Sequence, residues 1–389
     1  MRANPGGHIP PKDLIGRDEL IADIWRKLEG RSIVLSAERR MGKTCIIKKM
    51  NAEPIPGVLP VFRDLEKVRT PGEFAELVFH DVEDHLSRSQ RTAQKARNFL
   101  VNLGGTEVGG VFKLPQLQSQ HWKSLLTHTI EDLVEHQERK LIFFWDELPL
   151  MIYNVKQSCG EVVAMEVLDL LRALRQTHES LRMVFTGSIG LHNVLSELKR
   201  AGYANNPVND MAKVDVPPLL VDSTATALAE ALLLGERIQP AEHATVARCI
   251  AQTVDGFPFY IQHVVEKLAL LGEPVTETLV SEIVSGFLVD DNDAWELRHF
   301  RTRIDTYYTP EERPFALNLL DILAGADNAI GFDNLFNYLK AKLVTEDHEM
   351  ARQVLTLLRL DHYVTQTTAG EYKFRFSVIR RWWRLERGL

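Results

Sequence analysis

Residues 32–44 of the chain read SIVLSAERRMGKT, and they predict more of its architecture than any other segment. The first five residues are a short apolar run between polar neighbours, which indicates a buried β-strand. A helix-forming segment, TCIIKKM, begins at Thr44. A strand before the loop and a helix after it are the context that a phosphate-binding loop requires. We therefore expect residues 37–44 to bind phosphate groups.

The residues of this loop have distinct expected roles. Backbone N–H groups of the loop and of the following helix N-terminus converge on one point and bind anions. Gly42 lets the main chain approach the β-phosphate, Lys43 places a charge between the β- and γ-phosphates, and Thr44 offers its hydroxyl to magnesium. The residues predicted to contact the nucleotide here are Ala37, Arg39, Arg40, Met41, Gly42, Lys43, Thr44 and Cys45.

One position departs from the G-x-x-x-x-G-K-[ST] pattern of such loops. Ala37 stands where the pattern has its first glycine. An alanine at this turn is tolerated if its φ angle is negative, because only positive φ values strongly favour glycine.

A second apolar strand, LIFFW at residues 141–145, runs directly into Asp146 and Glu147. Ligands of parallel sheets bind at the carboxyl ends of the strands. We expect Asp146 to hold Mg²⁺ with Thr44 and Glu147 to polarise the water that attacks the γ-phosphate. Two adjacent carboxylates can also form a solvated strand end, and this alternative stays open. Together with the phosphate loop, the pair predicts an ATPase that uses ATP and Mg²⁺.

A further strand, LRMVF at residues 181–185, is followed by TGSIG. The hydroxyl of Ser188 or Thr186 is placed to contact the γ-phosphate or the attacking water from the neighbouring strand. Ser188 is the preferred candidate, and the alternative is an ordinary turn in which Ser188 caps a helix. The predicted catalytic residues are Lys43, Asp146, Glu147 and Ser188.

The remaining pattern predicts an α/β core followed by helices. Strands at residues 58–62 and 213–216 bring the total to five, and their alternation with helices indicates a parallel sheet covered on both faces. After residue 222 the segments are helical until residues 361–376, where two alternating strands surround Ala369 and Gly370. Helices followed by such a hairpin are typical of a winged helix. The predicted domains are an ATPase core at residues 1–220, a helical lid at 221–307 and a winged-helix domain at 308–389.

Composition limits the possible classes of protein. The 389 residues are 45% hydrophobic and 25% charged, and the net charge of −7 does not suggest a general nucleic-acid binder. The three cysteines are widely spaced and odd in number, so we expect a reducing, cytoplasmic environment. The N-terminus lacks the apolar run of a signal peptide, and no apolar stretch approaches the roughly 18 residues of a membrane span. We expect no membrane partner.

The C-terminal segment is locally basic and aromatic. Such a surface can contact phosphates and stack on bases, which makes DNA a possible partner. Alternatively, the arginines solvate one helix face while the aromatic residues pack inside the winged helix. The residues concerned are Lys373, Phe374, Arg375, Phe376, Arg380, Arg381, Trp382, Trp383, Arg384 and Arg387.

From about residue 13 to residue 387 the chain resembles the archaeal-ATPase group of AAA+-like and STAND-like P-loop proteins, which are related to origin-recognition ATPases. The matching segments are IGRDELIADIWRKL, ERRMGKT, WDELPLMI, FTGSIGL, DGFPFYIQHV and FRFSVIRRWWR. The resemblance implies an ASCE-type five-stranded sheet, a helical lid and a C-terminal winged helix. It also implies that Ile15, Gly16 and Arg17 line the adenine side and that Pro258 touches the base from the lid. A helix-leading turn at Gly16 and a plain helix start at Pro258 are the alternatives.

The chain departs from these relatives after the first sensor. Many of them carry P-L-x-G-R, whose arginine can serve a neighbouring subunit, whereas this chain has NNPVNDMAKV. Asn209 and Asp210 lie near the position of that arginine, and Arg200 is close but off the pattern. We therefore expect slow hydrolysis, or an arginine from a partner.

Three functions compete. The first is an ATP-binding and ATP-hydrolysing switch that couples nucleotide state to the winged helix. The second is a DNA-acting ATPase similar to origin-recognition proteins, and the third is a nucleotide-holding scaffold with little turnover. ATP and ADP are the expected ligands, and a protein partner or a second copy of the chain is possible.

Overall fold

The computed structural model describes residues 1–86, 90, 94–108, 111–113, 121–203, 205–238, 242–272 and 274–389. The chain forms two compact units. The sheet unit contains residues 17–36 and 43–216, and the C-terminal unit contains residues 1–16, 37–42 and 217–389. The three domains expected from the sequence stay a prediction.

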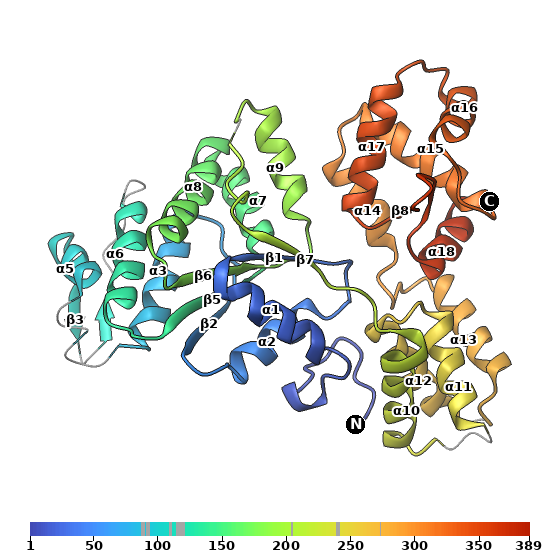
Figure 1. The fold of residues 1–389 in the computed structure, drawn as a ribbon, viewed down its shortest axis with the longest axis horizontal. Helices are drawn as coiled ribbons and strands as arrows, with labels where there is room; N and C mark the ends of the chain where they lie inside the picture. Colours follow the sequence, from blue (N-terminus) through green and yellow to red (C-terminus); the bar gives the residue numbers. More distant parts are fainter. Residues whose placement is uncertain are drawn as a thin grey trace. The chain divides into compact units, whose positions relative to one another are not determined.

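A five-stranded parallel sheet is the centre of the sheet unit (Figure 1). The order is β2-β5-β6-β1-β7, which inserts two strands between β1 and the strand that follows it in sequence. This confirms the predicted ASCE-type sheet, and it places the carboxyl ends of β1, β5 and β6 at one edge. The strands are β1 (Ile33–Ser36), β2 (Val58–Asp64), β5 (Lys140–Asp146), β6 (Leu181–Phe185) and β7 (Ala212–Asp215).

Helices cover both faces of this sheet (Figure 1). On one face lies α1 (Asp18–Gly30), whose Trp25 packs edge-on against Phe144 of β5. On the other face lies α3 (Pro71–Glu83), whose Phe74 packs against Trp145. Successive residues of a strand point to opposite faces, so β5 is buried on both sides. The other helices of this unit are α2 (Lys43–Ala52), α5 (Lys95–Asn102), α6 (Trp122–Glu135), α7 (Leu148–Cys159), α8 (Glu161–Thr177) and α9 (Leu191–Arg200).

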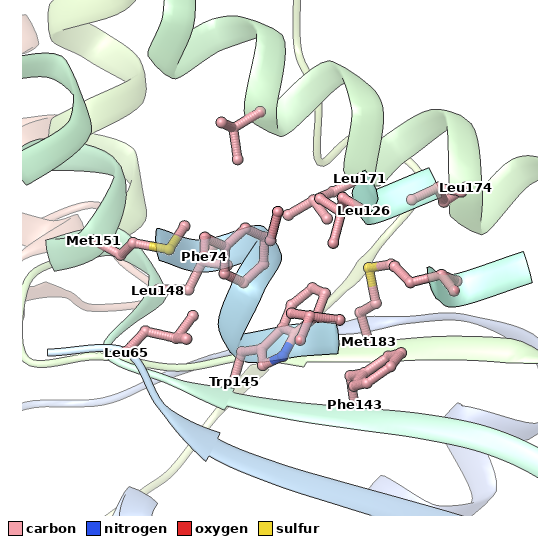
Figure 2. Close-up of a cluster of buried hydrophobic side chains, with 14 of the residues drawn as sticks. Leu65, Phe74, Leu126, Phe143, Trp145, Leu148, Met151, Leu171, Leu174 and Met183 are labelled. Atoms are coloured by element: carbon pink, nitrogen blue, oxygen red, sulfur yellow. The ribbon is translucent and has the colours of Figure 1, made fainter. Parts of the chain in front are cut away.

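Aromatic side chains form the centre of this core (Figure 2). Trp145 stacks on Phe143 at a centroid distance of 4.9 Å and on Phe185 at 6.1 Å, while Phe74 meets it edge-on at 5.1 Å. Such ring pairs add to the stability that the buried area provides. Because Asp146 follows Trp145 directly, this packing holds its backbone in place.

A short antiparallel hairpin joins β3 (Thr106–Val108) to β4 (Val111–Lys113). The sequence predicts a loop or small hairpin at residues 104–120, and the described part is a hairpin. Residues 109–110 and 114–120 lie outside the described residues.

Helices make up the first part of the C-terminal unit after residue 217. Their buried residues recur at helical spacing, for example Ile261, Val264, Val265 and Leu268 of α12. The segments are the single-turn η1 (Pro11–Asp13) near the N-terminus, η2 (Val221–Ala225), α10 (Thr226–Gly235), α11 (His243–Thr253), α12 (Pro258–Leu271), α13 (Glu277–Leu288) and α14 (Arg298–Tyr307).

The end of the chain has the predicted order of helices followed by a hairpin. Strands β8 (Val364–Gln366) and β9 (Tyr372–Phe374) pair in antiparallel register, and Ile330 bridges to Tyr372. The helices are α15 (Glu312–Gly325), α16 (Phe332–Leu343), α17 (His348–Leu360) and α18 (Ser377–Arg387). Within the described part of the chain, no helix combines the length and apolarity that a membrane crossing requires.

Candidate nucleotide site

The predicted phosphate loop is the turn between β1 and α2. Its residues Ala37–Gly42 leave strand geometry, and helix α2 begins at Lys43. Gly42 has a φ of 87°, and a Cβ at this position would meet no atom within 4 Å, so glycine serves the backbone conformation there. Ala37 lies outside the positive-φ region, which satisfies the condition on which the alanine is tolerated. Arg40 has a φ of 72°, an unusual value for a residue with a side chain.

The structure brings together the two oxygen groups that the sequence assigns to magnesium. The Thr44 hydroxyl donates to Oδ2 of Asp146 at 2.6 Å, and Asp146 is only 3% exposed. Burial raises the pKa of Asp146, and the negative charge of Asp64 raises it further. The hydrogen bond from Thr44 and the positive charge of Lys43 lower this pKa, but the net effect is a raised pKa. Lys43, Thr44 and Asp146 therefore form one electrostatic cluster in the sheet unit.

These oxygens fit a magnesium ion that is completed by phosphate and water. Mg²⁺ in nucleotide sites takes one or two protein oxygens and fills its octahedron with waters and phosphate oxygens. A hydroxyl and a carboxylate that already touch can present their oxygens to the same ion. Over the described residues, no group of three or more His, Cys, Asp or Glu side chains is arranged to hold a metal by itself.

Glu147 is held by the turn that follows β6. Both of its carboxylate oxygens accept from the Ser188 backbone N–H at 2.9 Å, and Oε2 also accepts from the Ser188 hydroxyl at 2.8 Å. A Cβ on Gly187 would lie 2.8 Å from Cδ of Pro149 and 3.3 Å from Oε2 of Glu147. A larger residue at position 187 would therefore push these groups apart.

Ser188 is thus placed to orient Glu147. Burial raises the pKa of Glu147, whereas the two Ser188 hydrogen bonds lower it. Thr186, the second sensor candidate, is 1% exposed, and its hydroxyl has no hydrogen-bond partner among the described residues. Asp64, which the sequence analysis passed over, is the register partner of Asp146 on β2. An acidic residue two positions after the predicted strand at residues 58–62 was the available signal.

The loop also contains a residue that the sequence analysis did not select. Glu38 is 2% exposed and forms an ion pair with Arg303 of α14. Its neighbours Arg39 and Arg40 both pair with Glu296. The sequence carries no short-range signal for these pairs, because the partners lie more than 250 positions away.

The residues expected on the adenine side are divided between the two units. Ile15, Gly16 and Pro258 belong to the C-terminal unit, and Arg17 belongs to the sheet unit with Cys45. A Cβ on Gly16 would lie 2.5 Å from Cβ of Thr224, and Pro258 is the first residue of α12. Both observations also agree with the alternatives of a packed turn and a helix start, so the adenine contacts stay predictions.

Arg17 lies next to the helix that follows the phosphate loop. Burial lowers the pKa of Arg17 to about 10, and the Cys45 thiol opposes this shift. The side chain is 3% exposed. The positive charge of Arg17 therefore interacts with Cys45 in the first turn of α2.

The segment that lacks the family arginine has a structural role of its own. Asp210 accepts from Nη2 of Arg175 at 3.0 Å and from its Nε at 3.2 Å, and Nη2 also donates to the Pro207 carbonyl at 2.8 Å. The Arg175 side chain is 2% exposed. Asp210 thus anchors the segment before β7 to α8.

Much of the basic C-terminal segment is engaged inside the winged helix. Arg380 donates to the Ala324 carbonyl at 3.0 Å, and Arg387 forms an ion pair with Asp321 at 2.8 Å. The four aromatic residues of the segment are buried, as the packing alternative expects: Phe374, Phe376, Trp382 and Trp383.

Comparison with solved structures finds the same fold in known proteins. The Walker-type ATPase of Pyrococcus abyssi superposes with a TM-score of 0.61 at 15% identity, over 96% of this chain and 97% of that one. The ORC2 protein of Aeropyrum pernix, solved as ADPNP–ADP complexes, has a TM-score of 0.52 at 12% identity, over 99% and 98%. No protein-family model and no curated protein matches the sequence. The resemblance inferred from the motifs is therefore confirmed at the level of the fold.

Proposed function

We propose that this protein binds ATP with Mg²⁺ at residues 37–44, hydrolyses it, and acts as a switch on its winged helix. One observation carries the proposal. The Thr44 hydroxyl and the Asp146 carboxylate, from separate parts of the sheet unit, meet at 2.6 Å where parallel strands end. This is the edge at which open parallel sheets bind ligands. The similarity to a Walker-type ATPase and to a protein solved with ADPNP and ADP supports the same reading.

The residues present supply each part of phosphoryl transfer. Backbone amides at the start of α2 and the Lys43 ammonium would bind the β- and γ-phosphates. Thr44 and Asp146 would hold Mg²⁺, which when bound neutralises charge on the phosphate oxygens. Glu147 would accept a proton from the attacking water while the bond between the γ-phosphorus and the bridging oxygen of ADP breaks. The Ser188 hydrogen bonds keep the Glu147 carboxylate in one orientation.

Hydrolysis is expected to be slow in the isolated chain. Asp210 lies near the position that carries an arginine in many relatives, and it is paired with Arg175. An arginine supplied in trans raises the rate of phosphoryl transfer by roughly 10³–10⁵ in related enzymes. A partner or a second copy of the chain would supply it.

A DNA-binding role has weaker support from the structure. Arg380 and Arg387 bond within the winged helix, and the aromatic residues that would stack on bases are buried. A scaffold without turnover requires no Glu147, so the two remaining roles differ in one measurable quantity, the release of phosphate.

The test compares phosphate release and nucleotide binding in wild type and Glu147→Gln. Loss of the general base should lower release by about 10²–10⁴ while ATP stays bound. The matched control is Glu138→Gln, which removes an exposed carboxylate from a loop of the same unit. Wild type that binds ATP but releases no phosphate would be a scaffold. A Glu147→Gln variant as fast as wild type would exclude the assigned role.

A further inference from the structure

A buried carboxylate lies in the phosphate loop. The side chain of Glu38 is 0% exposed, and its Oε1 accepts from Nη2 of Arg303 at 2.8 Å. The same oxygen accepts from the Arg39 backbone N–H at 2.7 Å and lies 3.4 Å from Nε2 of His299. A buried charge is tolerated only with such partners. Burial by itself would raise the pKa of Glu38, but Arg303 and His299 hold it well below its usual range. The residue is therefore a carboxylate at neutral pH.

Arg303 continues from this carboxylate to the start of the hairpin. Its Nη1 donates to the Asp361 carbonyl at 2.9 Å, and its guanidinium lies 5.6 Å from the centroid of the Tyr363 ring. The Tyr308 hydroxyl donates to Oδ2 of Asp361 at 2.8 Å. Residues 361–363 connect α17 to β8. One side chain thus bonds both to the loop and to the base of the winged-helix hairpin.

The other charged residues of the loop also bond within the C-terminal unit. Nε of Arg39 donates to Oε2 of Glu296 at 2.7 Å, and Nε of Arg40 donates to the same oxygen at 3.0 Å. The Arg40 guanidinium lies 4.5 Å from the ring centroid of Phe259. All three charged side chains of Ala37–Gly42 therefore bond to residues of the C-terminal unit between Glu296 and Arg303.

A negative charge in the loop is a disadvantage for binding a polyphosphate. Like charges repel strongly where water is excluded, and Glu38 lies in the segment whose amides are expected to meet the phosphates. The Arg303 guanidinium cancels this charge. Coupling between two sites is reciprocal. If nucleotide binding depends on the ion pair between Glu38 and Arg303, then the bound nucleotide also affects the other groups bonded to Arg303.

We propose that Arg303 is the positioning residue that couples the phosphate loop to the winged-helix hairpin. It neutralises Glu38 so that the loop accepts a triphosphate, and it transmits occupancy of the loop to the Asp361 backbone. This inference rests on the proposed function, because it requires ATP to bind the loop.

The first readout is affinity for a fluorescent ATP analogue in Arg303→Met, Glu38→Gln/Arg303→Met and Arg298→Met. Arg303→Met removes the guanidinium that neutralises Glu38, so affinity should fall by roughly tenfold or more. The double variant removes both charges of the buried ion pair and should bind about as tightly as wild type, because replacing both partners is often nearly neutral. Arg298→Met removes an exposed charge from the first turn of the same helix and should bind as wild type does.

The second readout is hydrogen exchange of residues 361–376 with and without a non-hydrolysable ATP analogue. The analogue should change exchange in wild type and in Arg298→Met but not in the double variant. The double variant keeps this readout available if Arg303→Met does not fold, because it has no buried carboxylate that lacks its guanidinium partner. An equal change in the double variant, or wild-type affinity in a folded Arg303→Met, would overturn the coupling.

The two proposals fail in different ways. If wild type binds the analogue no better than Lys43→Ala, the nucleotide-binding function fails. If wild type binds and Lys43→Ala does not, while the variants of Arg303 behave as wild type, only the coupling role of Arg303 fails.

Discussion

At the scale of single residues, Ser188 has a role that can be separated from folding. Its hydroxyl donates to Oε2 of Glu147, and its backbone N–H contacts both carboxylate oxygens. Removing the hydroxyl leaves the backbone bonds, so the fold and the phosphate loop are unaffected. A hydrogen bond to a charged group contributes about 1.5–3 kcal/mol, which corresponds to a factor of about ten to a hundred in rate.

We predict that Ser188→Ala lowers kcat for phosphate release by such a factor and leaves the dissociation constant of ATP unchanged. Ser188→Thr keeps a hydroxyl and should recover most of the rate. Steady-state phosphate release and equilibrium binding of a fluorescent analogue measure the two quantities. A rate equal to or above that of wild type in Ser188→Ala would show that the hydroxyl does not orient Glu147.

Glu38 makes the free energy of unfolding depend on pH in the acidic range. Arg303 and His299 outweigh the effect of burial and hold the pKa of Glu38 well below its ordinary value of 4.5. A carboxyl group whose pKa is lowered in the folded state stabilises above the unfolded pKa and loses this contribution as pH falls towards the folded pKa. The window for Glu38 therefore lies below about pH 4.5.

We predict that the difference in unfolding free energy between wild type and Glu38→Gln is largest at neutral pH. This difference should shrink as the pH falls below about 4.5. Loss of one partner from a buried ion pair costs about 3–5 kcal/mol at neutral pH. Urea unfolding at pH 7, 5 and 3.5 provides the comparison. A difference that does not change with pH would mean that the ion pair adds nothing to stability.

At the scale of secondary-structure elements, Asp255 connects α11 and α12 to the last helix. Its carboxylate accepts from the Ser377 hydroxyl and from the Val378 backbone N–H, both at 2.7 Å, at the start of α18. Phe257 also packs edge-on against Phe376 at 4.7 Å. The D-G-F-P segment thus caps a helix that is distant in sequence, a role that the sequence analysis did not foresee.

We predict that Asp255→Gly lowers the unfolding free energy by about 0.5–2 kcal/mol, the range for loss of a helix cap. Glycine accepts the φ of 51° at this position, so the change tests the cap and not the backbone. Asp255→Asn tolerates the same φ and retains an acceptor oxygen, and it should cost less. Chemical unfolding measures all three proteins, and equal stability of wild type and Asp255→Gly would rule out the cap.

The elements could be predicted because their signals are local. The apolar runs before Ala37 and after Lys140 occupy β1 and β5, and the acidic pair follows β5 as expected. The partners of Glu38 could not be predicted, because a charged loop residue is normally solvated and Arg303 is 265 positions away. The adenine contacts of Ile15, Gly16, Arg17 and Pro258 rest on the family resemblance and stay predictions.

At the scale of the whole molecule, the central event is the binding of ATP at residues 37–44. A ligand that binds only the folded state stabilises it by about 2.7 kcal/mol at a hundred times its dissociation constant. Bound ATP should therefore stabilise the folded chain.

We predict that saturating ATP with Mg²⁺ raises the melting temperature of wild type and that omitting Mg²⁺ reduces the shift. Differential scanning calorimetry of the full chain measures it. Asp146→Asn should show a smaller dependence on Mg²⁺ than wild type, because one of its two metal-holding oxygen groups is weakened. A shift in the melting temperature of wild type that does not depend on Mg²⁺ would argue against a metal site at Thr44 and Asp146.

The most direct measurement is the dissociation constant of ATP for wild type, Lys43→Ala and Lys48→Ala by isothermal titration calorimetry. Lys43 is 8% exposed at the first position of α2, whereas Lys48 is exposed one turn later on the same helix. We predict tight binding in wild type and Lys48→Ala and no detectable binding in Lys43→Ala. Equal affinity in wild type and Lys43→Ala would contradict the assignment of this loop as the nucleotide site.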